Sequence, residues 1–319
     1  MGGDHAPAEI IRGAVDATRE IPHSIVLVGQ EAVIRQELSK YKDTGSIDIV
    51  HAPETILMDE APTTVLRQKR DASVNVAVQL VKNHKADAVI SAGNTGALMA
   101  SALFGLGRIE GVDRPAIATV FPTMAGSHVL ILDMGANVDC KPRNLTQFGI
   151  MGSLYASTVM GVKNPKVGLL SIGGEEGKGN ELTVESYALL KQSKINFIGN
   201  VEGGDILAGK AHVVVCDGFV GNVILKFAES ASLTVIKFLK DELVRHPVSM
   251  FGGLLMVPAL KGLRKKVDYD AFGGAQLLGV NGVCIKAHGR AKAPAILSAI
   301  HLATRAVKED MISAMSKQV

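Results

Sequence analysis

Aromatic residues are scarce in this sequence, which has no tryptophan, four tyrosines and nine phenylalanines among its 319 residues. Proteins that bind single-stranded nucleic acid without sequence preference stack the bases on aromatic side chains, and this chain has too few for that purpose. Its formal net charge of +3 is also too small for general binding to a nucleic-acid backbone. These two shortages exclude nucleic acid as a partner.

Cysteine is also scarce, and its three positions, Cys140, Cys216 and Cys284, lie far apart. An odd number at such spacings predicts neither a disulfide framework nor a CxxC metal site, and is typical of a reducing cytoplasm. The nine histidines form no HExxH pair. We therefore expect no metal or other cofactor, although carboxylates from distant segments could still converge on one. The N-terminus has Asp4 and His5 where a signal peptide requires a basic start and an apolar run, which predicts a cytoplasmic protein.

Linkers are absent as well. No Pro-, Ser- or Gly-rich low-complexity stretch, long charged run or repeat of fixed period divides the chain. With 47% hydrophobic residues the chain can bury a large core. The simplest organisation is a single α/β domain spanning residues 1–319 with an inserted helical subdomain.

Short apolar runs, each followed by a polar loop and a helical pattern, recur along the chain. Strands that alternate with helices predict a mostly parallel sheet covered on both faces. Because the carboxyl ends of parallel strands share one edge of a sheet, we expect these loops to line one crevice. The four loops are SAGNTGA (residues 91–97), DMGAN (133–137), SIGGEEGKGNE (171–181) and CDGFVGNV (216–223).

The third loop places one cation, Lys178, among four glycines where an apolar strand gives way to a helix. Backbone N–H groups at such a junction can receive an anion. The loop is not a nucleotide P-loop, because Gly173 and Gly177 are one residue too close and the acids Glu175 and Glu176 would repel a triphosphate. It fits a small polar substrate, and the alternative is a glycine-rich turn with a solvated lysine.

Asparagines recur in these loops, where Asn94, Asn137 and Asn222 can each offer two N–H donors and one acceptor oxygen. Taken singly, each is better explained as a turn or helix-capping residue, because asparagine tolerates left-handed backbone and caps helices. Their repetition after several strands favours a ligand site.

An unusually apolar run occupies residues 248–260, and cations follow it at Lys261 and residues 264–266. The run is too short to cross a bilayer, which needs about 20 helical residues. An apolar tip flanked by cations is typical of an element that lies at a membrane surface, and the alternative is a hairpin buried in a dimer interface. We assign residues 240–268 to an inserted helical hairpin whose membrane tip is Met250, Phe251, Leu254 and Leu255.

Together with GGDHAP (residues 2–7), YDAFGGAQLLGVNG (269–282) and His288-Gly289, these motifs resemble the bacterial phosphate acyltransferase family, PlsX, from residue 2 to about residue 305. The resemblance implies a catalytic domain that moves a long-chain fatty acyl group from acyl carrier protein to inorganic phosphate, giving acyl phosphate for phospholipid synthesis. It implies a homodimer in peripheral contact with the anionic inner face of the cell membrane. It also implies a three-layer α/β/α fold similar to isocitrate dehydrogenase and phosphate acetyltransferase, with a protruding helical hairpin.

In the family, the lysine of GKGN and the asparagine of GFVGN are the positions most often given catalytic roles, and they correspond to Lys178 and Asn222. A thioester is already activated and phosphate is already a nucleophile, so the reaction needs positioning and charge stabilisation but no metal or covalent intermediate. We assign Lys178 to the phosphate or the developing oxyanion, and Asn222 to the thioester carbonyl. The substrate-binding candidates are Asp4, His5, Asn94, Thr95, Asn137, Gly177, Gly179, Asn180, Asp217 and Gly221.

Several of these residues have structural alternatives. His5 beside Asp4 could protonate the leaving thiolate, or the two could be a turn histidine and a helix-capping aspartate. Glu175 and Glu176 could hold the loop lysine in place or be solvated acids. Asp217 most simply caps the turn before the next helix.

Acyl carrier proteins are acidic, so clusters of cations are candidate docking surfaces. One cluster follows the apolar run, and the other is Arg67, Lys69 and Arg70 on a long helix predicted over residues 63–84. Three rival functions remain: a short-chain acyltransferase that uses coenzyme A and phosphate, a dehydrogenase of the isocitrate type, which the absence of GxGxxG disfavours, and a non-catalytic membrane-associated scaffold.

The chain departs from the family pattern at its start, because family members usually carry a short apolar strand and an Asp before Met-Gly-Gly-Asp. Either the start lies at an internal methionine, or the chain lacks a strand from the middle of the sheet. Buried unpaired backbone groups cost about 1–3 kcal/mol each, so the second case predicts a destabilised protein.

Overall fold

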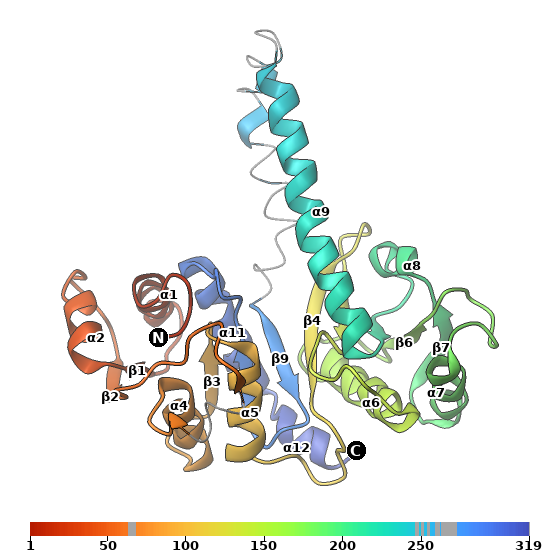
Figure 1. Ribbon diagram of the computed structural model, residues 1–319, viewed down its shortest axis with the longest axis horizontal. Coiled ribbons are helices and arrows are strands. Elements are labelled where there is room, and N and C mark those ends of the chain that lie inside the picture. Colours follow the sequence, from red (N-terminus) through yellow and green to blue (C-terminus); the bar gives the residue numbers. More distant parts are fainter. Residues whose placement is uncertain are drawn as a thin grey trace.

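The computed structural model describes residues 1–62, 68–245 and 273–318, together with positions 249, 252–253, 256–258 and 262. It contains an eight-stranded sheet with the order β3-β10-β9-β4-β5-β8-β6-β7 and a two-stranded sheet of β1 and β2 (Figure 1). The strands are β1 Ile25–Gly29, β2 Ile47–His51, β3 Ala88–Ser91, β4 Ala116–Pro122, β5 His128–Leu132, β6 Lys166–Leu170, β7 Asn196–Val201, β8 Val213–Val215, β9 Ala275–Leu278 and β10 Val283–Lys286.

Pairing is parallel at both ends of the large sheet and antiparallel in its middle. β5, β8 and β6 are adjacent and parallel, so the loops that follow them leave one edge together. Three antiparallel pairings separate β3 from β5, and the strand direction therefore reverses between them. The prediction that all four loops share one sheet edge is wrong for the loop after β3.

Helices cover both faces of the large sheet, which confirms the predicted three-layer α/β/α arrangement (Figure 1). Alternate residues of a strand point to opposite faces. Accordingly, Leu130 and Leu132 of β5 pack under α6, α7, α11 and α12, while Val129 and Ile131 pack under α4, α5, α8 and the start of α9. The helices are α1 Ala8–Thr18, α2 Glu31–Leu38, α4 Ser73–Lys82, α5 Thr95–Gly105, α6 Pro142–Thr158, α7 Glu181–Gln192, α8 Gly203–Ala208, α9 Gly218–Val244, α11 Ala293–Lys308 and α12 Met311–Ser316.

The helix α9 begins inside the CDGFVGNV motif and extends far beyond the sheet (Figure 1). It leads toward the predicted hairpin at residues 240–268, most of which lies outside the described residues. The tip residues Met250, Phe251, Leu254 and Leu255 are also outside them, so the membrane tip stays a prediction. By length and composition α9 itself could cross a membrane. One such helix is weak evidence for a membrane span, because core helices of soluble proteins can have the same length and composition.

The long helix predicted over residues 63–84 is wrong as a continuous element, because residues 69–72 are not helical and α4 begins only at Ser73. Glu54 binds the backbone of this segment. Its carboxylate accepts a hydrogen bond from the N–H of Asp71 at 3.1 Å, and its carbonyl oxygen accepts one from the N–H of Ser73 at 3.0 Å. Lys69 is in an ion pair with Glu60. Of the second predicted docking cluster, Arg67 lies outside the described residues and Arg70 is exposed.

The two-stranded sheet lies beside β3, the edge strand of the large sheet, but does not pair with it. The same helices nevertheless cover both sheets, because α4 contacts β1 and β3, and α1 packs on α11. No strand among the described residues connects β1 to β3.

Candidate active site

Asp133 anchors the loop that follows β5. Its carboxylate accepts hydrogen bonds from the backbone N–H groups of Ile117 (2.9 Å), Ala136 (3.0 Å) and Asn137 (2.7 Å), and from Asn137 Nδ2 (2.9 Å). Burial raises the pKa of Asp133, while these four donated bonds act in the opposite direction. Because the carboxylate is occupied by the protein itself, we assign Asp133 to holding the loop and not to contacting substrate.

The first turn of α9 approaches this loop so closely that two of its positions require glycine. A Cβ on Gly221 would overlap the carbonyl oxygen of Asp133, and a Cβ on Gly218 would lie 2.7 Å from the carbonyl oxygen of Asn137. Both distances are too short for real Cβ contacts. The glycines therefore fix how the helix begins relative to the loop.

Asn222 is held at the surface by this close packing. Asp217 caps α9 by accepting from the backbone N–H of Val220 at 2.8 Å, which confirms its predicted capping role. The Asn222 side chain is exposed, and its Cβ lies 3.4 Å from where a Cβ on Gly135 would stand. Its amide has no hydrogen-bond partner among the described residues, so both N–H donors are available to a ligand.

The loop after β6 is held by side chains of two neighbouring elements. Asn180 caps α7 by accepting from the backbone N–H of Thr183 at 2.9 Å. Asn200 of β7 donates from Nδ2 to the carbonyl oxygen of Glu175 at 2.8 Å. Gly179 adopts a φ of +123°, which side-chain-bearing residues rarely adopt. The turn before α7 is therefore held in a defined conformation, and its binding of a small polar substrate stays a prediction.

Lys178 is exposed on this loop and forms no ion pair with the residues that the structure describes. Glu176 instead pairs with Lys191 of α7 at 3.0 Å, so the alternative in which Glu176 holds Lys178 is wrong. A Cβ on Gly177 would meet nothing within 4 Å, which leaves the loop backbone open to a ligand. An exposed ammonium three residues before the start of α7 is of the kind that attracts an anion, and an anion site here stays a prediction.

Asp4 and His5 belong to a different group of loops. The Asp4 backbone N–H donates to the carbonyl oxygen of Gly289 at 2.9 Å, and its carboxylate lies 3.9 Å from Nε of Arg290. The N-cap of α1 is Pro7, and no side chain caps this helix. The alternative in which Asp4 is a helix-capping residue is therefore wrong.

The amides of Asn94 and Asn137 are occupied within the protein. Asn94 accepts from the backbone N–H of Ala97 at 3.0 Å and donates to carbonyl oxygens of residues 57, 58 and 60, which ties the start of α5 at Thr95 to that segment. Asn137 donates from Nδ2 to the carbonyl oxygen of Pro115 at 2.7 Å as well as to Asp133. A direct ligand contact by either amide stays a prediction.

One polar pair was missed by sequence reasoning. His288, after β10, has Nε2 3.7 Å from Oε1 of Glu229 on α9, and both side chains are largely buried. Glu229 lies two helical turns after Asn222, which is about 10 Å along the helix at 1.5 Å per residue. The loops around Asp4 and those around Asp133 therefore both lie along α9. His288-Gly289 was visible as a motif, but nothing in the sequence pointed to its partner on the helix.

Comparison with known proteins identifies the family of this chain. Residues 1–314 match the family described as "Fatty acid synthesis protein". A phosphate acyltransferase from Heliobacterium modesticaldum is 52% identical over all of this chain and 96% of that relative. The chain belongs to the phosphate acyltransferase family.

Two solved structures of low sequence identity share the fold. A phosphotransacetylase from Streptococcus pyogenes has a TM-score of 0.66 at 17% identity, and the match covers 94% of this chain and 91% of that one. A branched-chain phosphotransacylase from Enterococcus faecalis V583 has a TM-score of 0.61 at 16% identity, with 96% of each chain covered. These likenesses confirm the predicted fold class.

The cysteines of this phosphate acyltransferase are unsuited to accept an acyl group. Burial raises the pKa of Cys140 to about 11 and that of Cys284 to about 12. Burial also raises the pKa of Cys216, whose Sγ lies 3.7 Å from the carbonyl oxygen of Asp133. The thiolate is the nucleophilic form, so at neutral pH all three are unreactive thiols. This favours direct attack by phosphate over a thioester intermediate on the enzyme.

Replacing Asp133 by asparagine is expected to destabilise the enzyme by about 2–5 kcal/mol, because an amide keeps one acceptor oxygen and turns an N–H₂ group toward buried donors that then lack partners. The measurement is the free energy of unfolding in urea. Asp139→Asn, at an exposed position six residues along the same segment, is the matched control. Equal unfolding free energies for the two variants would show that Asp133 does not anchor the loop.

Proposed function

We propose that this enzyme transfers a long-chain fatty acyl group from acyl carrier protein to inorganic phosphate, giving acyl phosphate for phospholipid synthesis. The observation that carries the proposal is the placement of Lys178 and Asn222. Both are exposed, both have unoccupied polar groups among the described residues, and they follow the adjacent parallel strands β6 and β8. Such a pair can hold a phosphate and a thioester carbonyl side by side.

In the proposed reaction, a phosphate oxygen attacks the thioester carbonyl carbon. The Lys178 ammonium and the backbone at Gly177–Asn180 hold the phosphate, while the Asn222 amide donates to the carbonyl oxygen as negative charge develops on it. The tetrahedral intermediate then collapses, the C–S bond breaks, and the carrier leaves as a thiolate that takes up a proton. No cofactor is needed, because the thioester supplies the driving force.

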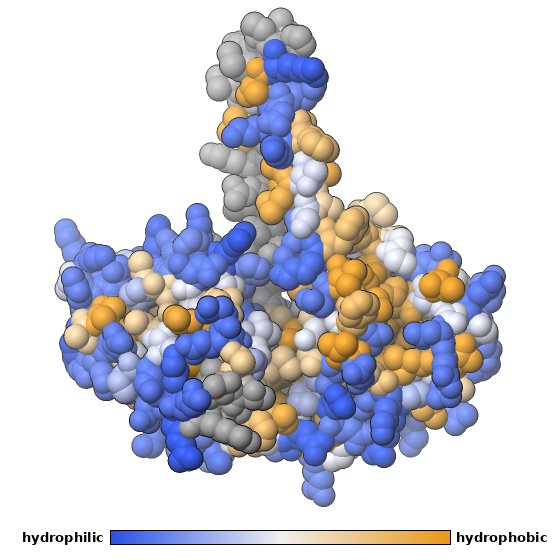
Figure 2. Space-filling view, in the orientation of Figure 1, coloured by the Kyte–Doolittle hydropathy of each residue, from blue (hydrophilic) through white to orange (hydrophobic). Residues whose placement is uncertain are grey.

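Exposed apolar side chains along α9 support a long acyl substrate and a second copy of the chain. Phe219, Val223 and Phe227 form a ridge with a spacing of four residues that begins beside Asn222. Figure 2 shows apolar side chains gathered at the base of α9 and continuing along it. We propose that the acyl chain lies along this ridge, and that the outer half of α9, with Phe238, makes the homodimer contact.

Peripheral contact with the anionic inner face of the membrane, through Met250, Phe251, Leu254 and Leu255, remains part of the proposal on sequence grounds alone. The cations at Lys261 and residues 264–266 all lie outside the described residues. Arg70 is exposed, whereas Lys69 is engaged by Glu60. If the acidic carrier docks on this side of the molecule, Arg70 is therefore the cation to test first.

The test is phosphate-dependent loss of thioester from purified palmitoyl acyl carrier protein, with acyl phosphate trapped as hydroxamate. We expect turnover with this substrate, dependence on added phosphate, and at least about tenfold lower kcat/KM with acetyl-coenzyme A, since short acyl groups cannot use the apolar ridge. The control omits phosphate. Phosphate-dependent turnover only with acetyl-coenzyme A would establish the short-chain function that the structural likeness to a phosphotransacetylase favours. Folded protein that turns over neither substrate would support the alternative function, a non-catalytic membrane-associated scaffold.

A further inference from the structure

Glu175 lies in the same turn as Lys178, three residues before it. The backbone N–H of Lys178 donates to the carbonyl oxygen of Glu175 at 3.1 Å, which closes the turn. Asn200, a buried residue of β7, donates to that same carbonyl oxygen at 2.8 Å. At the other end of the turn, the hydroxyl of Ser171 donates to the carbonyl oxygen of Lys178 at 2.8 Å. These bonds fix the position of an acid relative to a cation within one loop.

The side chains of Glu175 and Lys178 both lie against Gly173. A Cβ on Gly173 would stand 2.9 Å from Oε2 of Glu175 and 3.2 Å from Cγ of Lys178, so the carboxylate lies beside the stem of the lysine. This carboxylate forms no hydrogen bond or ion pair with the residues that the structure describes. A Cβ on Gly174 or Gly177 would meet nothing within 4 Å. An anion that reaches Lys178 across this open backbone therefore also meets Glu175.

The neighbouring acid, Glu176, has different surroundings. Its carboxylate is paired with Lys191 of α7 at 3.0 Å. The two acids are adjacent in sequence and both are exposed, yet one is engaged by a cation of the protein and the other lies beside the candidate site. Of the two, Glu175 is therefore the acid that can act on a ligand of the loop.

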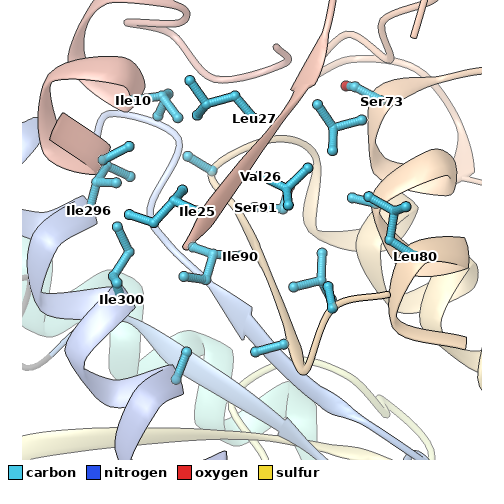
Figure 3. A pocket seen from close by; sticks show the side chains of 18 of the residues that line it. Ile10, Ile25, Val26, Leu27, Ser73, Leu80, Ile90, Ser91, Ile296 and Ile300 are labelled. Carbon is cyan, nitrogen blue, oxygen red and sulfur yellow. The ribbon is translucent and has the colours of Figure 1, made fainter. Parts of the chain in front are cut away.

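A cavity of about 870 Å³ between β1 and β3 has the opposite character. The side chains labelled around it in Figure 3 are aliphatic except for Ser73 and Ser91, and they include Ile25, Leu80 and Ile90. A dianion that entered it would lose its hydration in exchange for mainly apolar contacts, which is costly. The cavity therefore does not compete with the loop for phosphate.

An acid beside the cation of an anion site is unfavourable unless the anion itself carries a proton. An ionised carboxylate can only accept hydrogen bonds, and it repels another negative charge. Phosphate at neutral pH carries at least one O–H group, which can donate to a carboxylate while the other oxygens meet Lys178. Sulfate has the same shape but carries no O–H group at this pH. Sulfate would therefore meet Glu175 with repulsion and without a hydrogen bond.

We propose that Glu175 is a specificity-determining residue for phosphate, because its carboxylate accepts a hydrogen bond from the phosphate O–H group and repels anions that carry no proton, such as sulfate. The inference rests on the proposed function, in which the 171–181 loop holds the phosphate. Selectivity of this kind combines an attractive contact to the correct ligand with a repulsive one to the wrong ligand. It also explains why an acid stands beside the cation of a loop that receives an anion.

The experiment measures competition between phosphate and sulfate in the original enzyme and in Glu175→Gln, which keeps the size of the side chain and removes its charge. Sulfate is added as an inhibitor to the palmitoyl acyl carrier protein assay, and selectivity is the ratio of its Ki to the KM for phosphate. We expect this ratio to fall by at least about tenfold in Glu175→Gln, because the amide no longer repels sulfate and can donate to it. Glu176→Gln is the matched control and should keep the original ratio, because Lys191 already engages that acid.

A second measurement needs no acyl donor. In equilibrium dialysis with radiolabelled phosphate, sulfate should displace phosphate from Glu175→Gln at a concentration at least about tenfold lower than from the original enzyme. Arsenate carries O–H groups as phosphate does, so its competition with phosphate should be the same in the original enzyme and both variants. Selective binding without turnover of any acyl donor would contradict the proposed reaction while supporting the role of Glu175.

Three results would overturn the proposal. The first is a selectivity ratio for Glu175→Gln within about threefold of the original, which is the size of a general surface-charge effect. The second is an equal fall of the ratio in Glu176→Gln, or equal tightening of phosphate and sulfate in Glu175→Gln, since Glu175 would then only repel anions in general. The third is that the original enzyme neither binds phosphate nor turns over with it, which would also contradict the proposed function.

Discussion

Lys178→Ala is expected to lower the turnover number of the enzyme by about 10²–10³ while leaving its Tm within about 1 °C of the original. The side chain is exposed and forms no ion pair with described residues, so its loss removes little from folding. In the reaction, however, it is the cation of the 171–181 loop that can meet the phosphate. The measurement is kcat with palmitoyl acyl carrier protein, at phosphate concentrations well above KM.

A matched control separates charge at the site from charge in general. Lys194 is also exposed and lies in the turn after α7, so Lys194→Ala removes the same charge at the other end of that helix and should leave kcat unchanged. Asn222→Ala should reduce kcat to a similar extent, and Asn222→Asp more strongly, because a carboxylate would repel the developing oxyanion. If both Lys178→Ala and Asn222→Ala stay within about threefold of the original enzyme, the assignment is wrong.

The strands that carry the site could be predicted from sequence because each is an apolar run with a glycine-containing loop after it. β6 and β8 each end directly before the predicted loop, and Asp217 and Asn180 cap the helices that follow, as short polar residues do at such positions. What could not be predicted was strand order. The direction of β3 relative to β5 depends on β9 and β10, which come from the last part of the chain.

Long-range polar contacts were also beyond sequence reasoning. Asp133 belongs to the DMGAN motif, but its burial and the N–H of Ile117, which comes from the preceding strand, appear only in three dimensions. Likewise, Glu54 precedes the helix predicted over residues 63–84 but interrupts it, because its carboxylate accepts a hydrogen bond from the backbone N–H of Asp71. In each case a partner distant in sequence overrides what local residue pattern favours.

Gly221→Ala is expected to disable the enzyme by displacing Asn222. The added Cβ would overlap the carbonyl oxygen of Asp133, a backbone atom held by the buried loop, so α9 must move away. Overpacking of this kind typically costs about 1–3 kcal/mol. Asn222 is the next residue, and a shift of about 1 Å in a positioning group can cost about 10² in rate. We therefore expect a lower Tm together with a loss of kcat of at least about 10².

Gly204→Ala is the control for this substitution, because Gly204 is also near the start of a helix, α8, and a Cβ there would meet nothing within 4 Å. It should keep full activity and, since alanine favours helix over glycine, gain slightly in stability. The decisive comparison is between Gly221→Ala and Asp133→Asn, which disturb the same loop, the first through the Asp133 carbonyl and the second through the Asp133 carboxylate. If both lower Tm but only Asp133→Asn lowers kcat, the close approach of α9 to the Asp133 loop stabilises the fold without positioning Asn222.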